Sequence, residues 1–70
     1  MATDQVLLDV FAEARRTWDD LVSLQPDIKA ASSHLTADDL AELEKRVGAH
    51  YEAVQSLANA LERVWSAAHR

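Results

Sequence analysis

Histidine is the residue type in this sequence whose side chain can exchange protons near neutral pH. Of the three histidines, His50 is the one that lies within a series of regularly spaced apolar residues. Such a histidine could be a metal ligand, a pH switch or a phosphoacceptor. A metal pair on one helix needs a second ligand one turn away, and no histidine or carboxylate lies four residues from His50. We therefore favour a polar residue on a packed helix seam, where it sets the register. His34, near a turn, and His69, near the chain end, fit surface positions.

Carboxylates form two adjacent pairs, Asp19–Asp20 and Asp38–Asp39, which could be imagined as a cation site. They lack the loop glycine and the alternating oxygen ligands of a calcium loop, so a solvated helix face and a capped helix start explain them better. The sequence contains no phosphate-binding loop and no nucleophile elbow. It has no cysteine, which excludes thiolate metal sites and cysteine nucleophiles. We expect no catalytic residue, no metal, no cofactor and no enzymatic activity.

The strongest pattern is a coiled-coil seam in the C-terminal half of the chain. Nine positions follow one another at alternating steps of three and four, and eight of them are apolar: Leu40, Leu43, Val47, His50, Val54, Leu57, Leu61, Val64 and Ala68. This spacing predicts a long helix packed along another helix. Thr36 is a good N-cap, and Asp39 can complete a capping box. We expect this helix to span about residues 37–69.

A second apolar stripe, at similar spacing, predicts a helix over about residues 4–25. Its members are Leu7, Phe11, Ala14, Trp18, Leu21 and Ile28. Pro26 disrupts a helix interior but suits a first turn, so it predicts a break or kink at Gln25–Pro26. A helical segment over about 26–32 should follow, with a loop over 26–35 as the alternative. The main turn should lie between Ser33 and Thr36.

These elements predict an all-α fold, an antiparallel helical hairpin forming one domain over residues 1–70. The positions beside the C-terminal seam are mostly alanine or aromatic, where a two-stranded coiled coil usually carries charges. They are Glu44, Arg46, Tyr51, Ala53, Ala58, Ala60, Trp65 and Ala67. The apolar face is therefore wide enough for two neighbours. One is the first helix, and the other we expect to be a second copy, which gives a homodimeric four-helix bundle.

Charge narrows the choice of partner. The 70 residues carry a formal net charge of −5, which argues against nucleic acid and anionic membranes. No apolar stretch approaches the roughly 20 residues that span a bilayer. The absence of cysteine fits a reducing compartment, and we expect the protein in the cytoplasm. The basic residues should pair with neighbouring acids: Arg15, Arg16, Lys45 and Arg46.

The function that these features favour is a non-enzymatic protein–protein interaction module: an adaptor, a small chaperone or a regulatory inhibitor. The two tryptophans fit either packing or a binding hot spot. The candidate interface residues are Phe11, Trp18, Val47, His50, Tyr51, Val54, Leu57, Leu61 and Trp65.

Two alternatives remain open. The size and two-helix pattern resemble those of small helical-hairpin proteins, such as the dimeric RNA-binding repressor of primer and the small chaperones of type III secretion. No motif of either is matched. The first resemblance implies a dimeric nucleic-acid-binding regulator. The second alternative is a metal or histidine site that forms around His50 only across a dimer interface.

Overall fold

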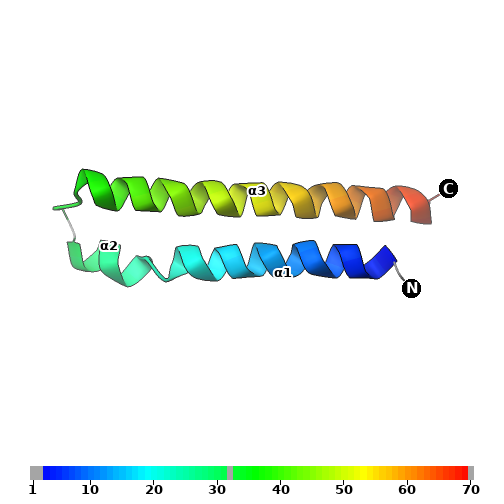
Figure 1. Cartoon of the computed structure of the whole chain (residues 1–70), viewed down its shortest axis with the longest axis horizontal. Helices are drawn as coiled ribbons and strands as arrows, with labels where there is room; N and C mark the ends of the chain where they lie inside the picture. Colours follow the sequence, from blue (N-terminus) through cyan, green and yellow to red (C-terminus); the bar gives the residue numbers. More distant parts are fainter. Residues whose placement is uncertain (1–2, 32, 70) are drawn as a thin grey trace.

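The computed structural model describes residues 3–31 and 33–69, and within them the chain is a bent helical arm folded back on a straight one (Figure 1). The helices are α1 (Thr3–Val22), α2 (Gln25–Ala31) and α3 (Ala37–Ala68). The hairpin measures 54 × 15 × 14 Å, and the start of α1 and the end of α3 lie at the same end, opposite the turn. The predicted all-α helical hairpin is confirmed; the expected end of the middle segment, Ser32, lies outside the described residues.

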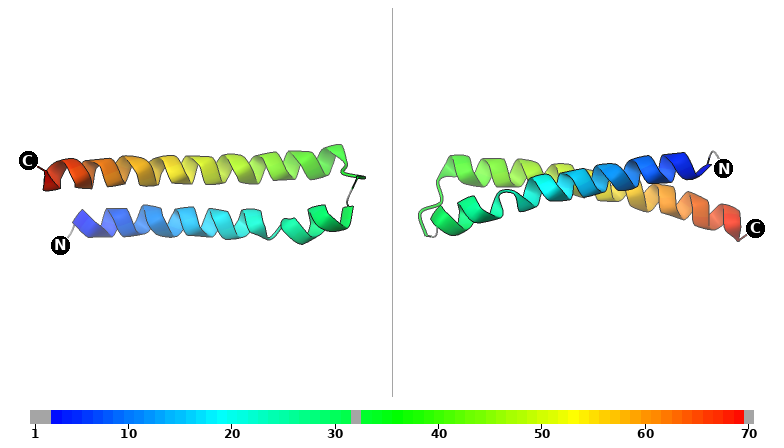
Figure 2. Two further views of the ribbon diagram at one scale, coloured as in Figure 1. Left: turned by 180° about the vertical axis from the view of Figure 1, so that it is seen from behind. Right: turned by 90° about the horizontal axis from the view of Figure 1, so that it is seen from below.

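The first arm bends at the α1–α2 junction, where Ser23 and Leu24 form a turn (Figure 2). The break therefore precedes the predicted Gln25–Pro26 position by two residues. Proline has no N–H to donate to the carbonyl four residues earlier, and its ring clashes with that carbonyl. For Pro26 that carbonyl belongs to Val22, the last residue of α1. The alternative of a loop over 26–35 is wrong, because α2 occupies most of that range.

The start of α3 is fixed by the capping box that the sequence predicts. The Thr36 hydroxyl accepts a hydrogen bond from the Asp39 amide at 3.1 Å, and the Asp39 carboxylate accepts one from the Thr36 amide at 3.0 Å. These two bonds satisfy amides that a helix start otherwise leaves unpaired. The helix ends at Ala68, one residue before the predicted end.

Replacing Thr36 with alanine should lower the free energy of unfolding by about 1 kcal/mol, because the first turn of α3 loses its side-chain acceptor. Thr36→Ser keeps the hydroxyl and should stay close to the wild type. Urea unfolding followed by circular dichroism measures both variants. Equal stability of the alanine and serine variants would contradict the role of the cap.

The two arms meet mainly through α1 and α3. The less exposed residues between them form two rows on each arm, which we call the hairpin seam. Its members are less exposed than their neighbours and recur at steps of three and four. On the first arm they are Leu7, Val10, Ala14, Thr17, Leu21, Leu24, Ile28 and Ala31; on α3 they are Leu43, Arg46, His50, Ala53, Leu57, Ala60 and Val64. This pattern is the 3–4 packing of an antiparallel helix pair.

The hairpin seam contains four of the six residues of the first predicted stripe and four of the nine of the second. Every seventh position, such as Ala14 or His50, lies on the seam as predicted. The other predicted positions, such as Trp18 and Val54, stay exposed. On α3 the small or polar residues Arg46, Ala53 and Ala60 take their place, and on the first arm Val10, Thr17, Leu24 and Ala31 do. The best buried side chains are small: Ala14, Thr17, Ala53 and Ala60, between 2% and 8% exposed. Alanine lets the two backbones approach closely, whereas a bulky row would hold them apart.

Candidate interaction surface

Ten large apolar side chains lie outside the hairpin seam and remain 39–65% exposed. We call them the apolar face: Leu8, Phe11, Trp18, Val22, Leu40, Val47, Tyr51, Val54, Leu61 and Trp65. Among the described residues, Val6 is the one other large apolar side chain with comparable exposure. Scattered exposed apolar residues are ordinary, but a contiguous group marks an interaction site.

The helix period places the two halves of the apolar face on the same side of the hairpin. Phe11 and Trp18 each follow a seam residue by four positions, and so do Val54 and Leu61 on α3. Four residues advance a helix by about 40° beyond a full turn. Because the arms run antiparallel and face each other, equal advances carry both rows toward the same side. The Trp18 ring accordingly lies 5.4 Å from the ring of His50 on the opposite arm, centroid to centroid.

The α3 half of the apolar face is a heptad row of its own. Leu40, Val47, Val54 and Leu61 recur every seven residues, and Tyr51 and Trp65 each lie one position after a seam residue. On α1, Leu8 and Val22 also follow a seam residue directly. A regular row of this kind is the pattern that a further helix can pack against.

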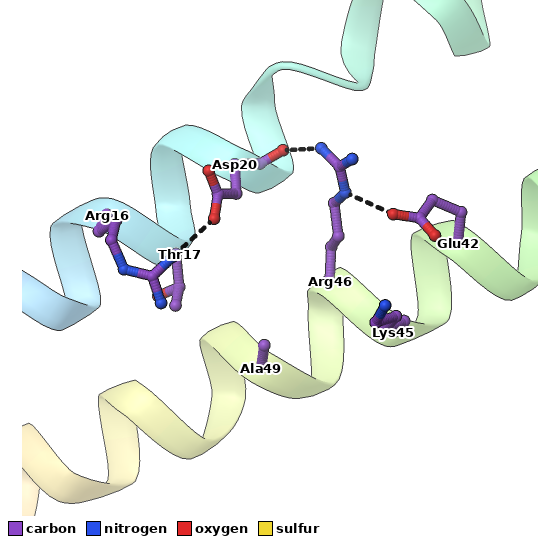
Figure 3. A pocket seen from close by; sticks show the side chains of 7 residues that line it. All are labelled: Arg16, Thr17, Asp20, Glu42, Lys45, Arg46 and Ala49. Atoms are coloured by element: carbon purple, nitrogen blue, oxygen red, sulfur yellow. Dashed lines mark hydrogen bonds and ion pairs between the residues drawn. The ribbon is translucent and has the colours of Figure 1, made fainter.

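The opposite side of the hairpin is polar over the second half of α1, where Figure 3 shows a pocket lined by residues of both arms. Toward the start of α1, the exposed Val6 lines a mostly apolar pocket with Ala60 and Val64. Arg46 crosses between the arms: Nε donates to the Glu42 carboxylate at 2.9 Å, and Nη1 donates to the Asp20 carbonyl at 2.8 Å (Figure 3). The same Nη1 lies 3.0 Å from the Ser23 hydroxyl. Asp20 is in the last turn of α1, where carbonyls lack helical partners, so Arg46 caps α1 from the other arm.

Ion pairs along α1 add to this polar character. Arg16 hydrogen-bonds Glu13 and reaches Asp20 at 3.0 Å, and Arg15 lies 3.4 Å from Asp19. The predicted pairing with neighbouring acids is confirmed for Arg15, Arg16 and Arg46, whereas the described residues show no ion pair of Lys45. The hydrogen bond from Arg16 lowers the pKa of Glu13 below its usual value. The stability from this pair is present above the ordinary glutamate pKa and is lost as the pH falls through the lowered value.

His50 is half-buried on the hairpin seam and contacts the other arm. Its Nδ1 lies 2.9 Å from the Thr17 hydroxyl, which is also 3.0 Å from the backbone carbonyls of Glu13 and Ala14. Thr17 is 4% exposed. The hydroxyl has one proton, so when it donates to a carbonyl of its own helix, Nδ1 of His50 must donate to it. The contact ties α1 to α3 at one level, as expected for a polar residue that sets register.

The Thr17–His50 contact should appear as a coupling of about 0.5–1.5 kcal/mol in a double-mutant cycle of Thr17→Val and His50→Leu. Valine keeps the shape of threonine and removes the hydroxyl. Urea unfolding of the two single variants and the double variant gives the coupling energy. Thr17→Ser, which retains the hydroxyl, should keep coupling to His50. Strict additivity of the two substitutions would contradict the bond.

The predicted interface residues fall into two groups. Seven of the nine lie on the apolar face: Phe11, Trp18, Val47, Tyr51, Val54, Leu61 and Trp65. His50 and Leu57 lie instead on the hairpin seam, half-buried between the arms. The prediction does not include Leu8, Val22 and Leu40, which are also exposed on this face, although Leu40 has a seven-residue spacing to Val47 and Val54. It also missed Thr17, which the same spacing places on a row with Val10 and Leu24.

Other kinds of site find little support in the described part of the chain. Within residues 3–31 and 33–69, no three His, Cys, Asp or Glu residues come together as a metal site would require. None of the three described helices has the length and apolar character to cross a membrane. No protein-family model matches the sequence, and no curated protein or solved structure matches it at a significant level.

Proposed function

We propose that this chain is a non-enzymatic protein–protein interaction module of the cytoplasm that works through its apolar face. We also propose that the face joins two copies into a homodimeric four-helix bundle. The observation that carries the proposal is the gathering of ten exposed large apolar side chains on one side of the hairpin, opposite the polar side. An adaptor, a small chaperone and a regulatory inhibitor each use such a surface to hold a protein.

The surface area of the single hairpin supports a partner. The chain exposes 5728 Å², whereas a folded monomer of 7.8 kDa exposes about 4,400 Å² on average. The excess is about 1,300 Å². A standard interface buries about 800 Å² per partner, and permanent homodimers bury more. Covering the apolar face would therefore bring the exposed area close to that of an ordinary folded protein.

The small interior of the hairpin supports the same proposal. Among the described residues, no large side chain is fully buried, and the buried positions are three alanines and Thr17. Fully burying a leucine- or phenylalanine-sized side chain contributes about 1.5–3 kcal/mol. A chain of this length has a marginal core at best and often gains stability by oligomerising. The large side chains that could supply this stability are those of the apolar face.

Self-association tests the proposal directly. Sedimentation equilibrium should show a dimer, and the melting temperature should rise over about a hundredfold increase in chain concentration. The concentration dependence follows because dimer formation stabilises the folded chain by mass action. A folded monomer whose melting temperature does not change with concentration would overturn the homodimer.

A further inference from the structure

We infer that the apolar face binds a second copy of this chain in an antiparallel arrangement, with α3 packed on α3 and α1 packed on α1. The twofold axis crosses the hairpin at the level of residues 15 and 52. This inference rests on the proposed function, because it names the occupant of the same face and its orientation. It is carried by the lengths and the centres of the two apolar stretches.

Two symmetric arrangements can bring the apolar faces of two hairpins together. In the parallel one, the twofold axis runs along the hairpin, and each α3 lies over α1 of the second copy at an unchanged level. In the antiparallel one, the axis runs across the hairpin within the interface, and each helix lies over its own counterpart in reverse. The distribution of apolar residues along the two arms distinguishes these arrangements.

The apolar stretches of the two arms differ in length. On α1 the face runs from Leu8 to Val22, about 21 Å at 1.5 Å per residue. On α3 it runs from Leu40 to Trp65, about 38 Å. In the antiparallel arrangement, each helix packs on its own counterpart, so the two apolar stretches have the same length. In the parallel arrangement α3 packs on α1, and the α3 stretch extends beyond both ends of the α1 stretch.

The Thr17–His50 hydrogen bond fixes which levels of the two arms correspond. It places residue 45 at the level of Val22, the last residue of α1, so Leu40 lies beyond that helix, and it places Leu61 at the level of the first turns of α1, before Leu8. In the parallel arrangement both ends of the α3 stretch would face segments of the second copy that carry no residue of the apolar face. In the antiparallel arrangement, Leu40 meets Trp65 of the second copy instead.

The centres of the two stretches coincide, as a single twofold axis requires. The midpoint of Leu8 and Val22 is residue 15, and the Thr17–His50 contact places residue 15 opposite residue 52. The midpoint of Leu40 and Trp65 lies between residues 52 and 53. One axis at this level therefore superposes both stretches on their counterparts. It brings Tyr51 to the level of Val54 of the second copy.

Distances between spin labels test the orientation, and the absence of cysteine allows labels at single sites. Ala41→Cys and Gln55→Cys are suitable because both residues are exposed on α3 and outside the apolar face and the hairpin seam. The antiparallel dimer separates the two labels along the bundle by about 35 Å at residue 41 and by about 8 Å at residue 55. The parallel dimer gives nearly the same distance at both sites.

Sedimentation of each labelled variant, checked against the wild type, separates the possible outcomes. A dimer with a much longer label distance at residue 41 than at residue 55 supports the inference. A dimer with equal distances overturns the antiparallel arrangement and leaves the proposed homodimer standing. A wild-type chain that stays monomeric overturns both, and the apolar face then belongs to a different protein.

Discussion

Replacing Val54 with glutamate should convert the protein from a dimer to a monomer and lower its melting temperature. Val54 lies in the middle of the α3 half of the apolar face and is 43% exposed in the single hairpin. In the proposed dimer it lies near the twofold axis, so the substitution buries two carboxylates close together without partners. An unpaired buried charge costs several kcal/mol. We expect self-association to weaken at least about a hundredfold, which corresponds to roughly 3 kcal/mol.

The neighbouring residue provides the control. Gln55→Glu adds the same charge one position along α3, but Gln55 is exposed and lies outside the apolar face. It should leave the dimer and its melting temperature nearly unchanged. Sedimentation equilibrium and concentration-dependent melting measure both variants. If Val54→Glu and Gln55→Glu behave alike, the apolar face is not the surface through which the chain associates.

The helices could be predicted from the sequence because each depends on local signals. The Thr36 capping box, the periodic apolar residues and Pro26 all act within one or two helical turns. The predicted bend lies two residues after the observed one because the effect of Pro26 falls on the carbonyl of Val22, in the preceding turn. Local signals of this kind determine where helices begin and end, and they do not determine which face of a helix meets its neighbour.

The choice of face could not be predicted from periodicity alone. A seam on α3 needs two neighbouring rows of residues, and His50 and Leu57 belong to one of them in either case. The second row can be the bulky one, with Val54 and Leu61, or the small one, with Ala53 and Ala60. The structure uses the small row, which permits close contact of the arms. Hydropathy favours the bulky row, because it measures apolar character and takes no account of the distance between helices.

The side-chain contacts between the two arms could not be predicted from the sequence pattern either. Arg46 was expected to pair with Glu42, one turn away, and it does. Its second role, capping the Asp20 carbonyl 26 residues earlier, depends on the register of the two arms. The same is true of the Thr17–His50 hydrogen bond. The hydropathy pattern does not single out Thr17, because it assigns the neighbouring Trp18 to the buried stripe.

Ala60→Leu should destabilise the protein by about 1–3 kcal/mol. Ala60 is 2% exposed, at a point where α3 approaches α1. Three additional carbon atoms must enter the contact between the arms or the open apolar pocket that Ala60 lines with Leu7 and Val64, so the neighbouring side chains have to shift. Ala58→Leu is the matched control. Ala58 is exposed beside the apolar face, so the three added carbon atoms do not contact the first arm. It should be neutral or should strengthen the dimer.

Urea unfolding at a fixed chain concentration compares the two leucine variants, and sedimentation shows whether each still associates. If the hairpin seam is the one that contains Ala53 and Ala60, Ala60→Leu lowers the unfolding midpoint and Ala58→Leu does not. Similar midpoints for the two variants would mean that the arms pack through the bulky row of Val54 and Leu61, which Ala58 and Ala60 flank on either side. That row would then be unavailable to a second copy, so the two leucine variants test the hairpin seam and the apolar face together.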